Sequence, residues 1–498
     1  MSHTATLHAR FLHGLALHPT RIALRLEDGQ EFTYEHLHEL ALRWAGALHT
    51  TGDEPPRAVG VLAGKTIAAY AGLLAALYAG AAAVPLHPEF PEARTRRMLD
   101  AAGVTTLLAD RQGLTTLADP GIPVLAPLDQ GPLPGRPLDA PLPVAPDGIA
   151  CVLFTSGSTG RPKGVPVRHD SADHYFQVLE NRYGFQPDDV FSQSFDLNFD
   201  CALFDLFCAW GAGASAHPVP AVAYRDLPGF AAARGLTVWF STPSAITLVR
   251  RTGGLAPGSL PGLRWSFFAG EALRAADVED WLAAAPGSTV ENIYGPTELT
   301  VTITGHRWSP ETSPELCVNG LVPIGRVHPG HDHVLLGENG TPDDTEGELC
   351  VTGPQLTAGY LDPRDDDGRF LERDGRRWYR TGDRVRRLPG DELVYLGRLD
   401  SQVQLHGWRV ELAEVEHAVR GCVGVHDAVA VTRSDANGLH LVVYYTGVPT
   451  PARELARRLR DVLPKGMLPR HYRHLDAFPL NTNRKIDRAR LRDLPDEH

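Results

Sequence analysis

Apolar and polar positions alternate along most of the chain in two periods, one typical of buried strands and one typical of helices. An apolar run at 57–64 is followed by a helical pattern at 66–80 and by a second short apolar run at 105–110. This strand–helix–strand order predicts parallel sheets covered by helices. A further apolar run, 149-IACVLF-154, predicts another strand.

The pattern changes in the last third of the chain. Strand-like runs at 347–353 and 393–398 lie in a turn-rich region and predict a mainly β subdomain. Beyond residue 401, helical patterns at 411–421 and 452–463 flank strand patterns at 425–432 and 439–445. About one hundred residues remain there, which is enough for a small, separate α+β domain.

The stretch 67–86 carries no charged residue over twenty positions, which is long enough to span a bilayer. It is rich in Ala and Gly, however, and Gly80 and Pro85 would end a helix before it crossed. We therefore expect a buried helix followed by a strand. The Pro-rich segment 120–146 is interpreted as a surface connection.

Composition and charge narrow the class of protein. A chain of 498 residues is expected to form two or three domains. Its net charge of −12 argues against nucleic-acid and membrane-surface partners. Six scattered cysteines without zinc spacing and an N-terminus without a signal-peptide pattern favour the reducing cytoplasm. The oligomeric state is not readable, and a monomer is the default.

Candidate chemistry begins directly after the strand at 149–154, in the loop 154-FTSGSTGRPKG-164. Consecutive Gly, Ser and Thr residues allow backbone N–H groups and hydroxyls to surround an anion, and Lys163 adds a positive charge. A flexible linker is the alternative interpretation. The spacing is not that of a Walker loop, because no Ser or Thr follows Lys163.

Three further segments supply groups that a phosphate loop lacks. In 292-NIYGPTEL-299, a turn presents Thr297 and Glu298, a hydroxyl and a carboxylate suited to a phosphate and to Mg²⁺. In 379-YRTGDRV-385, a turn is expected to expose Asp383 as an acceptor for ribose hydroxyls. In 479-PLNTNRKID-487, Lys485 lies in a polar loop near the end of the sequence. Each segment alone is more often an ordinary turn.

Together with 397-GRLDSQVQLHGWRVELAEVE-416, and in this order, these motifs resemble the adenylate-forming superfamily. That superfamily includes the adenylation domains of non-ribosomal peptide synthetases and acyl-CoA synthetases. The resemblance covers nearly the whole chain. It implies an α/β fold with a large N-terminal domain (1–399) of stacked mixed or parallel sheets with helices plus a β subdomain. A small mobile α+β C-terminal domain (400–498) would follow a hinge near Asp400.

The resemblance also implies ATP and Mg²⁺ as cosubstrates and assigns a role to each matching position. Lys485 would be the catalytic residue, because its charge would offset repulsion between a carboxylate and the α-phosphate. Glu298 would hold Mg²⁺. The residues assigned to the nucleotide are Thr155, Ser156, Gly157, Ser158, Thr159, Gly160, Lys163, Gly270, Glu271, Asn292, Tyr294, Gly295, Thr297, Asp383 and Arg398.

The segment 193-QSFDLNFDCALFDLF-207 bears on which acid is activated. It resembles the stretch in which amino-acid-activating members place an Asp against the substrate ammonium, and Asp200 matches that Asp. Asp200 as a helix N-cap, or Asp196 in its place, are the alternatives. The amino-acid pocket implied by the resemblance comprises Phe199, Asp200, Cys201, Phe204, Ser241, Phe267, Ala269, Ile293, Val301 and Thr302.

An apolar pocket with one acid suggests alanine, valine, proline or a proline derivative as substrate. The leading hypothesis is a freestanding enzyme that adenylates such an amino acid and transfers it to the phosphopantetheine thiol of a separate carrier protein in natural-product biosynthesis. An acyl- or aryl-CoA synthetase and a non-catalytic scaffold are the alternatives. Two positions depart from the family pattern, Gln404 in place of Lys and Arg484 in place of Gly.

Overall fold

The computed structural model of the chain describes residues 5–52, 54–126, 133–157, 161–337, 339–400, 402–435, 438–479 and 486–495. The chain forms two compact units. The first comprises Met1–Pro88, Leu99–Phe154 and Gly164–Leu399. The second comprises Asp400–His498 together with Glu89–Met98 and Thr155–Lys163, two segments that a simple division at residue 400 places in the first.

The largest sheet of the first unit has nine strands in the order β15-β14-β13-β12-β11-β9-β10-β1-β2. Its parallel centre consists of β9 (Val190–Gln193), β11 (Val238–Ser241), β12 (Trp265–Phe268) and β13 (Thr289–Tyr294). The remaining strands are β1 (Ile22–Arg25), β2 (Glu31–Thr33), β10 (Ser215–Pro218), β14 (Thr304–Arg307) and β15 (Arg326–Val327). The side chains of β11 and β12 are almost wholly buried, as is typical of parallel strands that are covered on both faces.

A second sheet has the order β6-β5-β3-β4-β7-β8. Its strands are β3 (Ala58–Leu62), β4 (Ala82–Leu86), β5 (Thr106–Ala109), β6 (Val124–Leu125), β7 (Ile149–Thr155) and β8 (Lys163–Arg168). Helix α3 (Ile67–Tyr78) packs on β3 and β4 and is buried along its whole length. The uncharged stretch 67–86 is therefore a buried helix and strand, as expected. No helix within the described residues has the length and apolar character that crossing a bilayer requires.

The β subdomain is a six-stranded antiparallel sheet of the first unit. Its strands are β16 (Asp332–Leu336), β17 (Pro342–Asp343), β18 (Glu346–Thr352), β19 (Phe370–Arg373), β20 (Arg376–Arg387) and β21 (Leu393–Arg398). The expected exposed turn at Asp383 is wrong. Asp383 lies inside β20 and is only 5% exposed, because Gly382 (φ 72°) and a register shift beside it bend the strand without ending it.

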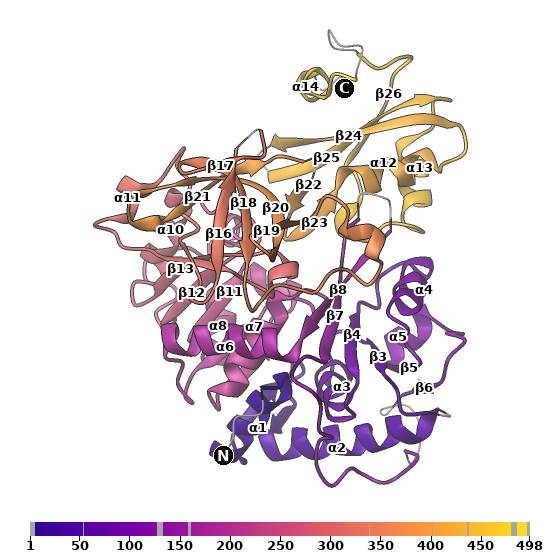
Figure 1. Cartoon of the computed structure of the whole chain (residues 1–498), viewed down its shortest axis with the longest axis vertical. Helices are drawn as coiled ribbons and strands as arrows, with labels where there is room; N and C mark the ends of the chain where they lie inside the picture. Colours follow the sequence, from indigo (N-terminus) through magenta and orange to yellow (C-terminus); the bar gives the residue numbers. More distant parts are fainter. Residues whose placement is uncertain are drawn as a thin grey trace. The chain divides into compact units, whose positions relative to one another are not determined.

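The helices of the first unit cover these sheets, and Figure 1 labels most of them. Helices α1, α2, α3 and α7 contribute to one large apolar core, in which α1 packs on α7 and α2 packs on α3. Those not yet located are α1 (Leu7–Leu17), α2 (Tyr34–Thr51), α5 (Arg111–Thr116), α6 (His169–Tyr183), α7 (Cys201–Gly211), α8 (Leu227–Arg234), α9 (Ser244–Arg251), α10 (Ala275–Ala284) and α11 (Ser313–Leu316). Helix α4 (Glu92–Ala101) contains the boundary between the units at Met98.

The part of the second unit beyond residue 400 is α+β, as the pattern predicts. Its strands are β22 (Gln402–Leu405), β23 (Trp408–Glu411), β24 (Val425–Asp435), β25 (Gly438–Gly447) and β26 (His471–His474). Its helices are α12 (Leu412–Arg420), α13 (Ala452–Leu459) and α14 (Arg488–Asp493). Apolar residues of α12, α13, β24 and β25 form its own core, which is what a separate domain requires.

Candidate functional site

The candidate site lies where four parallel strands of the nine-stranded sheet end. Strands β9, β11, β12 and β13 are neighbours, so their carboxyl ends lie at one edge of the sheet. Open parallel sheets generally bind ligands at this edge. Ser241 ends β11, and the segments that follow the other three strands contain Asp200, Ala269 and Thr297. The fold thus explains why residues up to one hundred positions apart belong to one candidate site.

Asp200 precedes α7, yet its carboxylate makes no side-chain capping hydrogen bond to the start of that helix. Instead, its Oδ2 accepts a hydrogen bond from the Thr297 hydroxyl at 2.7 Å. Burial raises the pKa of Asp200, and the Thr297 hydroxyl partly offsets this effect. Two residues that the sequence analysis assigned to different ligands, Asp200 and Thr297, are therefore in direct contact.

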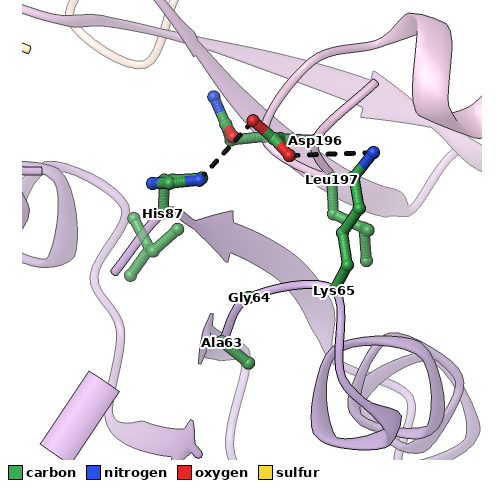
Figure 2. A pocket seen from close by; sticks show the side chains of 8 residues that line it. Ala63, Gly64, Lys65, His87, Asp196 and Leu197 are labelled. Atoms are coloured by element: carbon green, nitrogen blue, oxygen red, sulfur yellow. Dashed lines mark ion pairs between the residues drawn. The ribbon is translucent and has the colours of Figure 1, made fainter. Parts of the chain in front are cut away.

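Asp196, the alternative acid, lies beside a lysine and a histidine. Figure 2 shows the side chains of Lys65 and His87 pointing toward its carboxylate. Lys65 Nζ lies 3.9 Å from Oδ1, and His87 Nε2 lies 3.5 Å from Oδ2. These residues line a cavity of about 10 Å³. Asp196 therefore already has protein partners.

The predicted pocket residues combine buried aromatic and aliphatic groups with two hydroxyls. The rings of Phe204 and Phe267 lie 4.9 Å apart, and both are fully buried. The Ser241 hydroxyl accepts a hydrogen bond from Trp239 at 2.9 Å, and Thr302 donates to the hydroxyl of Tyr175 at 3.1 Å. Also buried are Ala269, Ile293 and Val301, whereas Phe199 and Cys201 are partly exposed.

Asp383 and its neighbours form the second polar cluster of the first unit. Tyr294 donates to Asp383 Oδ2 at 2.5 Å, and Arg398 donates to Oδ1 at 2.8 Å. The pairing of β20 with β21 places Asp383 directly opposite Arg398. Burial, reinforced by the charge of Asp383, holds the pKa of Tyr294 well above its usual value, so the phenol remains a donor. The sequence analysis had assigned all three residues to the nucleotide.

Other predicted nucleotide residues are held by the backbone around them. The Asn292 amide donates to the carbonyl oxygens of Val322 and Pro323, at 3.2 and 2.8 Å. The Glu271 carboxylate accepts from the backbone N–H of Ser244 at 2.8 Å, and Gly270 has a φ of 84°. Because hydrogen bonds to the backbone hold the side chains of Asn292 and Glu271, these residues are suited to a rigid nucleotide-binding site.

Gly295 is required by its surroundings. A Cβ at this position would lie 2.5 Å from the Cα of Thr302, because the chain folds back on itself after β13.

Glu298, the predicted metal ligand, is fully buried in the short helix Thr297–Leu299. Its Oε1 accepts a hydrogen bond from Tyr360 at 2.5 Å. The described residues contain no group of three or more His, Cys, Asp or Glu side chains that could hold a metal. A single carboxylate is still consistent with Mg²⁺, which is commonly bound by one or two carboxylates together with substrate phosphates.

The phosphate-loop motif connects β7 to β8 and belongs to the second unit. A Cβ on Gly157 would lie 2.1 Å from the carbonyl oxygen of Arg161, so this tight loop requires glycine there. The Gly157 amide donates to the Glu414 carboxylate at 3.3 Å, which shows that the amide faces an anion. Thr155 ends β7, Ser156 donates to the Arg409 carbonyl at 2.6 Å, and Lys163 is 6% exposed.

The structure does not describe every residue that the sequence analysis named. Ser158, Thr159, Gly160, Arg484 and Lys485 lie outside the described residues. The predicted hinge residue, Asp400, accepts a hydrogen bond from the backbone of Gln402 at 3.1 Å. Gln404 lies in β22, and its buried side-chain oxygen has no hydrogen-bond partner among the described residues.

The sequence analysis missed three polar residues that contact the predicted site. Lys65 contacts Asp196, Tyr360 contacts Glu298, and Gln355 holds the segment that carries Val301 and Thr302. A Gly-Lys pair directly after an apolar strand could have drawn attention to Lys65. Gln355 and Tyr360 have no such signal, because their partners are distant in sequence.

The fold and this arrangement of motifs define an adenylation enzyme of the adenylate-forming superfamily, a class that uses ATP. The chain belongs to the family of AMP-binding enzymes, whose model matches residues 11–361.

Known proteins resemble the chain over nearly its full length. It is 36% identical to phosphinothricin tripeptide synthetase PhsC of Streptomyces viridochromogenes, over 99% of this chain and 45% of that protein. The chain thus spans less than half of that relative's length. The crystal structure of IdnL7 is 59% identical, with a TM-score of 0.76 and 98% of each chain covered. The Vibrio cholerae adenylation domain AlmE, solved with glycyl-adenosine-5'-phosphate, is 26% identical, with a TM-score of 0.86, 99% of this chain and 98% of that chain covered.

Proposed function

We propose that this enzyme activates a small or medium-sized apolar amino acid, such as alanine, valine, proline or a proline derivative, as an aminoacyl-AMP. The observation that carries the proposal is the half-buried Asp200 carboxylate, whose nearby donors among the described residues are the Thr297 hydroxyl and the thiol and backbone N–H of Cys201, and which adjoins apolar residues assigned to the amino-acid pocket. An anion in such surroundings is costly unless a cation accompanies it. The α-ammonium group of an amino acid supplies that cation.

The contrast between the two candidate acids supports Asp200. Asp196 lies close to Lys65 and His87, so its charge is already balanced by the protein. Asp200 has no Lys, Arg or His within ion-pair distance among the described residues. The fatty or aryl acid substrate of an acyl- or aryl-CoA synthetase carries no cation that could pair with Asp200. The alternative function therefore fits this site less well than amino-acid activation does.

In the proposed first step, a carboxylate oxygen of the amino acid attacks the α-phosphorus of ATP. The bond from that phosphorus to the bridging oxygen breaks, and pyrophosphate leaves. Lys485 would offset the repulsion between the two anions. Asp383 with Arg398 would hold the ribose, and Thr297 the α-phosphate. Glu298 would provide one carboxylate for Mg²⁺, whose charge screens the phosphates.

Further support comes from the phosphate-loop motif. The residues assigned to the β- and γ-phosphates are Thr155, Ser156, Gly157, Ser158, Thr159, Gly160 and Lys163. The Gly157 amide already donates to a carboxylate, as an anion-binding amide should. For the second step, we propose transfer of the aminoacyl group to the phosphopantetheine thiol of a carrier protein, whose sulfur displaces AMP.

The test is amino-acid-dependent exchange of labelled pyrophosphate into ATP, measured over the twenty amino acids, D-alanine and alkylated prolines. Exchange is expected with one or a few small apolar amino acids. Asp200→Asn should raise the KM for that amino acid about 10²-fold, since loss of a buried charge partner costs about 2 to 5 kcal/mol. Asp196→Asn is the matched control and should leave that KM within about threefold. Exchange with fatty or aryl acids alone would contradict the proposal.

A further inference from the structure

Two adjacent β-branched residues beside the proposed amino-acid pocket have strained backbones. Thr300 has a φ of 55° and Val301 a φ of 69°, in the left-handed region that β-branched residues rarely occupy. Both are almost fully buried, at 3% and 2% exposure. Strain of this kind persists only where surrounding contacts enforce it, and it is commonly found at functional sites.

Three of the contacts that hold this conformation come from one side chain, Gln355, in the loop after β18. Its amide nitrogen lies within hydrogen-bond distance of the carbonyl oxygens of Leu299 (2.9 Å), Thr300 (3.2 Å) and Thr302 (2.8 Å). Thr300 in turn donates its hydroxyl to the carbonyl oxygen of Gln355 at 2.8 Å. Gln355 is fully buried, so water cannot replace these hydrogen bonds.

Gln355 also contacts two histidines in addition to these carbonyl oxygens. Its side-chain oxygen lies 3.3 Å from Nδ1 of His328, and its backbone N–H donates to His331 at 3.1 Å. Carbonyl oxygens only accept hydrogen bonds, so the NH₂ group must face the three carbonyl oxygens and the side-chain oxygen must face His328. A side chain held at both ends can transmit a fixed position to the segment that it contacts.

The segment Leu299–Thr302 in turn determines where the pocket wall lies. Val301 and Thr302 are two of the proposed pocket residues, and Thr297, which donates to Asp200, is two residues before Leu299. The backbone of Thr302 passes so close to Gly295 that a side chain there would clash. A peptide rotation at Thr300 or Val301 would therefore displace the proposed pocket residues Val301 and Thr302 and disturb the close approach of Thr302 to Gly295.

We propose that Gln355 is a positioning residue that sets amino-acid specificity by holding the strained segment Leu299–Thr302 against the pocket. This inference rests on the proposed function. A buried glutamine that merely satisfied carbonyl groups would affect stability alone. A positioning residue must also change the KM for the amino acid and the preference among amino acids, while leaving the KM for ATP nearly unchanged.

The experiment compares the full chain with two variants in pyrophosphate exchange and thermal unfolding. Gln355→Met keeps the side-chain length but removes both donor hydrogens, and we expect at least a tenfold higher KM for the preferred amino acid and a less than threefold change in the KM for ATP. The preference between the two best amino acids should fall by at least threefold. Leu227→Ala, a fully buried residue of a separate apolar cluster, is the stability control and should lower the unfolding temperature without changing either KM.

A Gln355→Met enzyme with a lowered unfolding temperature but wild-type amino-acid KM and preference would overturn the inference. If this variant does not fold, the double variant Thr300→Gly with Gln355→Met replaces it. Glycine tolerates the left-handed conformation, so the backbone strain at that position is removed. The same rise in amino-acid KM is expected there, and an unchanged KM again overturns the inference. If the wild-type enzyme showed no amino-acid-dependent pyrophosphate exchange, that result would contradict the proposed function itself.

Discussion

At the scale of single residues, Lys485 and Asp200 would divide the proposed chemistry between them. Asp200 would bind a group that is already charged in the ground state, so its loss should weaken amino-acid binding. Lys485 would act on charge that develops as the carboxylate meets the α-phosphate, so its loss should lower kcat. The two residues can therefore be distinguished by kinetics.

We predict that Lys485→Ala lowers the rate of pyrophosphate exchange about 10²- to 10³-fold, the usual cost of losing a group that stabilises transition-state charge. Thioester formation from a supplied aminoacyl-AMP should continue, because that step does not bring two anions together. Single-turnover measurements of each half-reaction test this. Equal losses in both half-reactions would contradict the assigned role.

Three aspartates within ten residues show what the sequence can and cannot predict at this scale. The resemblance to amino-acid-activating members singled out Asp200. It could not show that Asp196 lies beside Lys65 and His87, or that Asp205 accepts from the backbone N–H of Ser194 at 3.0 Å. Those partners come from other elements, and their approach depends on packing. For the same reason, Gln355 was invisible from the sequence.

At the scale of elements, the apolar pattern predicted β3, α3, β5 and β7 of the second sheet, but it did not single out β9, β11, β12 and β13, the strands that position the site. Parallel strands leave a strong signal because their buried faces read as unbroken apolar runs. The prediction of an exposed turn at Asp383 was wrong because the local sequence does not show the strand pairing around it. Thr381, Gly382 and Asp383 read as a turn, but strand pairing on both sides overrides that local preference.

The carboxyl end of β9, which leads to Asp200, is fixed by Lys65 from the loop after β3. Lys65 Nζ donates to the carbonyl oxygens of Gln193 and Ser194, at 3.0 and 2.7 Å. Burial lowers the pKa of this lysine, while the nearby charges of Asp196 and Asp205 act in the opposite direction. The lysine thus links two sheets of the first unit through their loops.

We predict that Lys65→Met lowers the free energy of unfolding by about 3 kcal/mol, because it leaves the carbonyl oxygens of Gln193 and Ser194 without this donor and removes the positive charge beside Asp196 and Asp205. Arg234→Met is a matched control. Arg234 also donates to two carbonyl oxygens, those of Leu26 and Glu27 at 2.9 and 2.8 Å, but lies away from the buried acids. Its replacement should cost about 1 kcal/mol. Urea unfolding measures both, and equal losses would refute the special role of Lys65.

At the scale of the whole molecule, the first unit buries several histidines in neutral form. Burial lowers the pKa of His8, His169 and His217 to about 4 and that of His328 to about 3. His169 Nδ1 accepts the backbone N–H of Leu7 at 3.1 Å, so protonation of that nitrogen would break a contact that holds α1. In the unfolded chain, these imidazoles regain a pKa of about 6.5.

We predict from these values that the protein loses stability steeply as the pH falls below about 6.5. Between the folded and unfolded pKa values, the unfolded chain binds more protons, so acid favours unfolding. Each such histidine contributes a slope of up to about 1.4 kcal/mol per pH unit. The contribution is fully present above pH 6.5 and disappears as the pH approaches the folded pKa.

Urea unfolding between pH 7.5 and 5.0 measures this slope, and a histidine variant separates it from the carboxylates that also titrate in acid. His217→Gln keeps a polar side chain of similar size without a titrating group, and should flatten the profile by about one proton over this range. His13→Gln, at an exposed position of α1, is the matched control and should leave the profile unchanged. If the profiles of His217→Gln and the wild type have the same slope, burial of neutral His217 is not a source of the acid sensitivity.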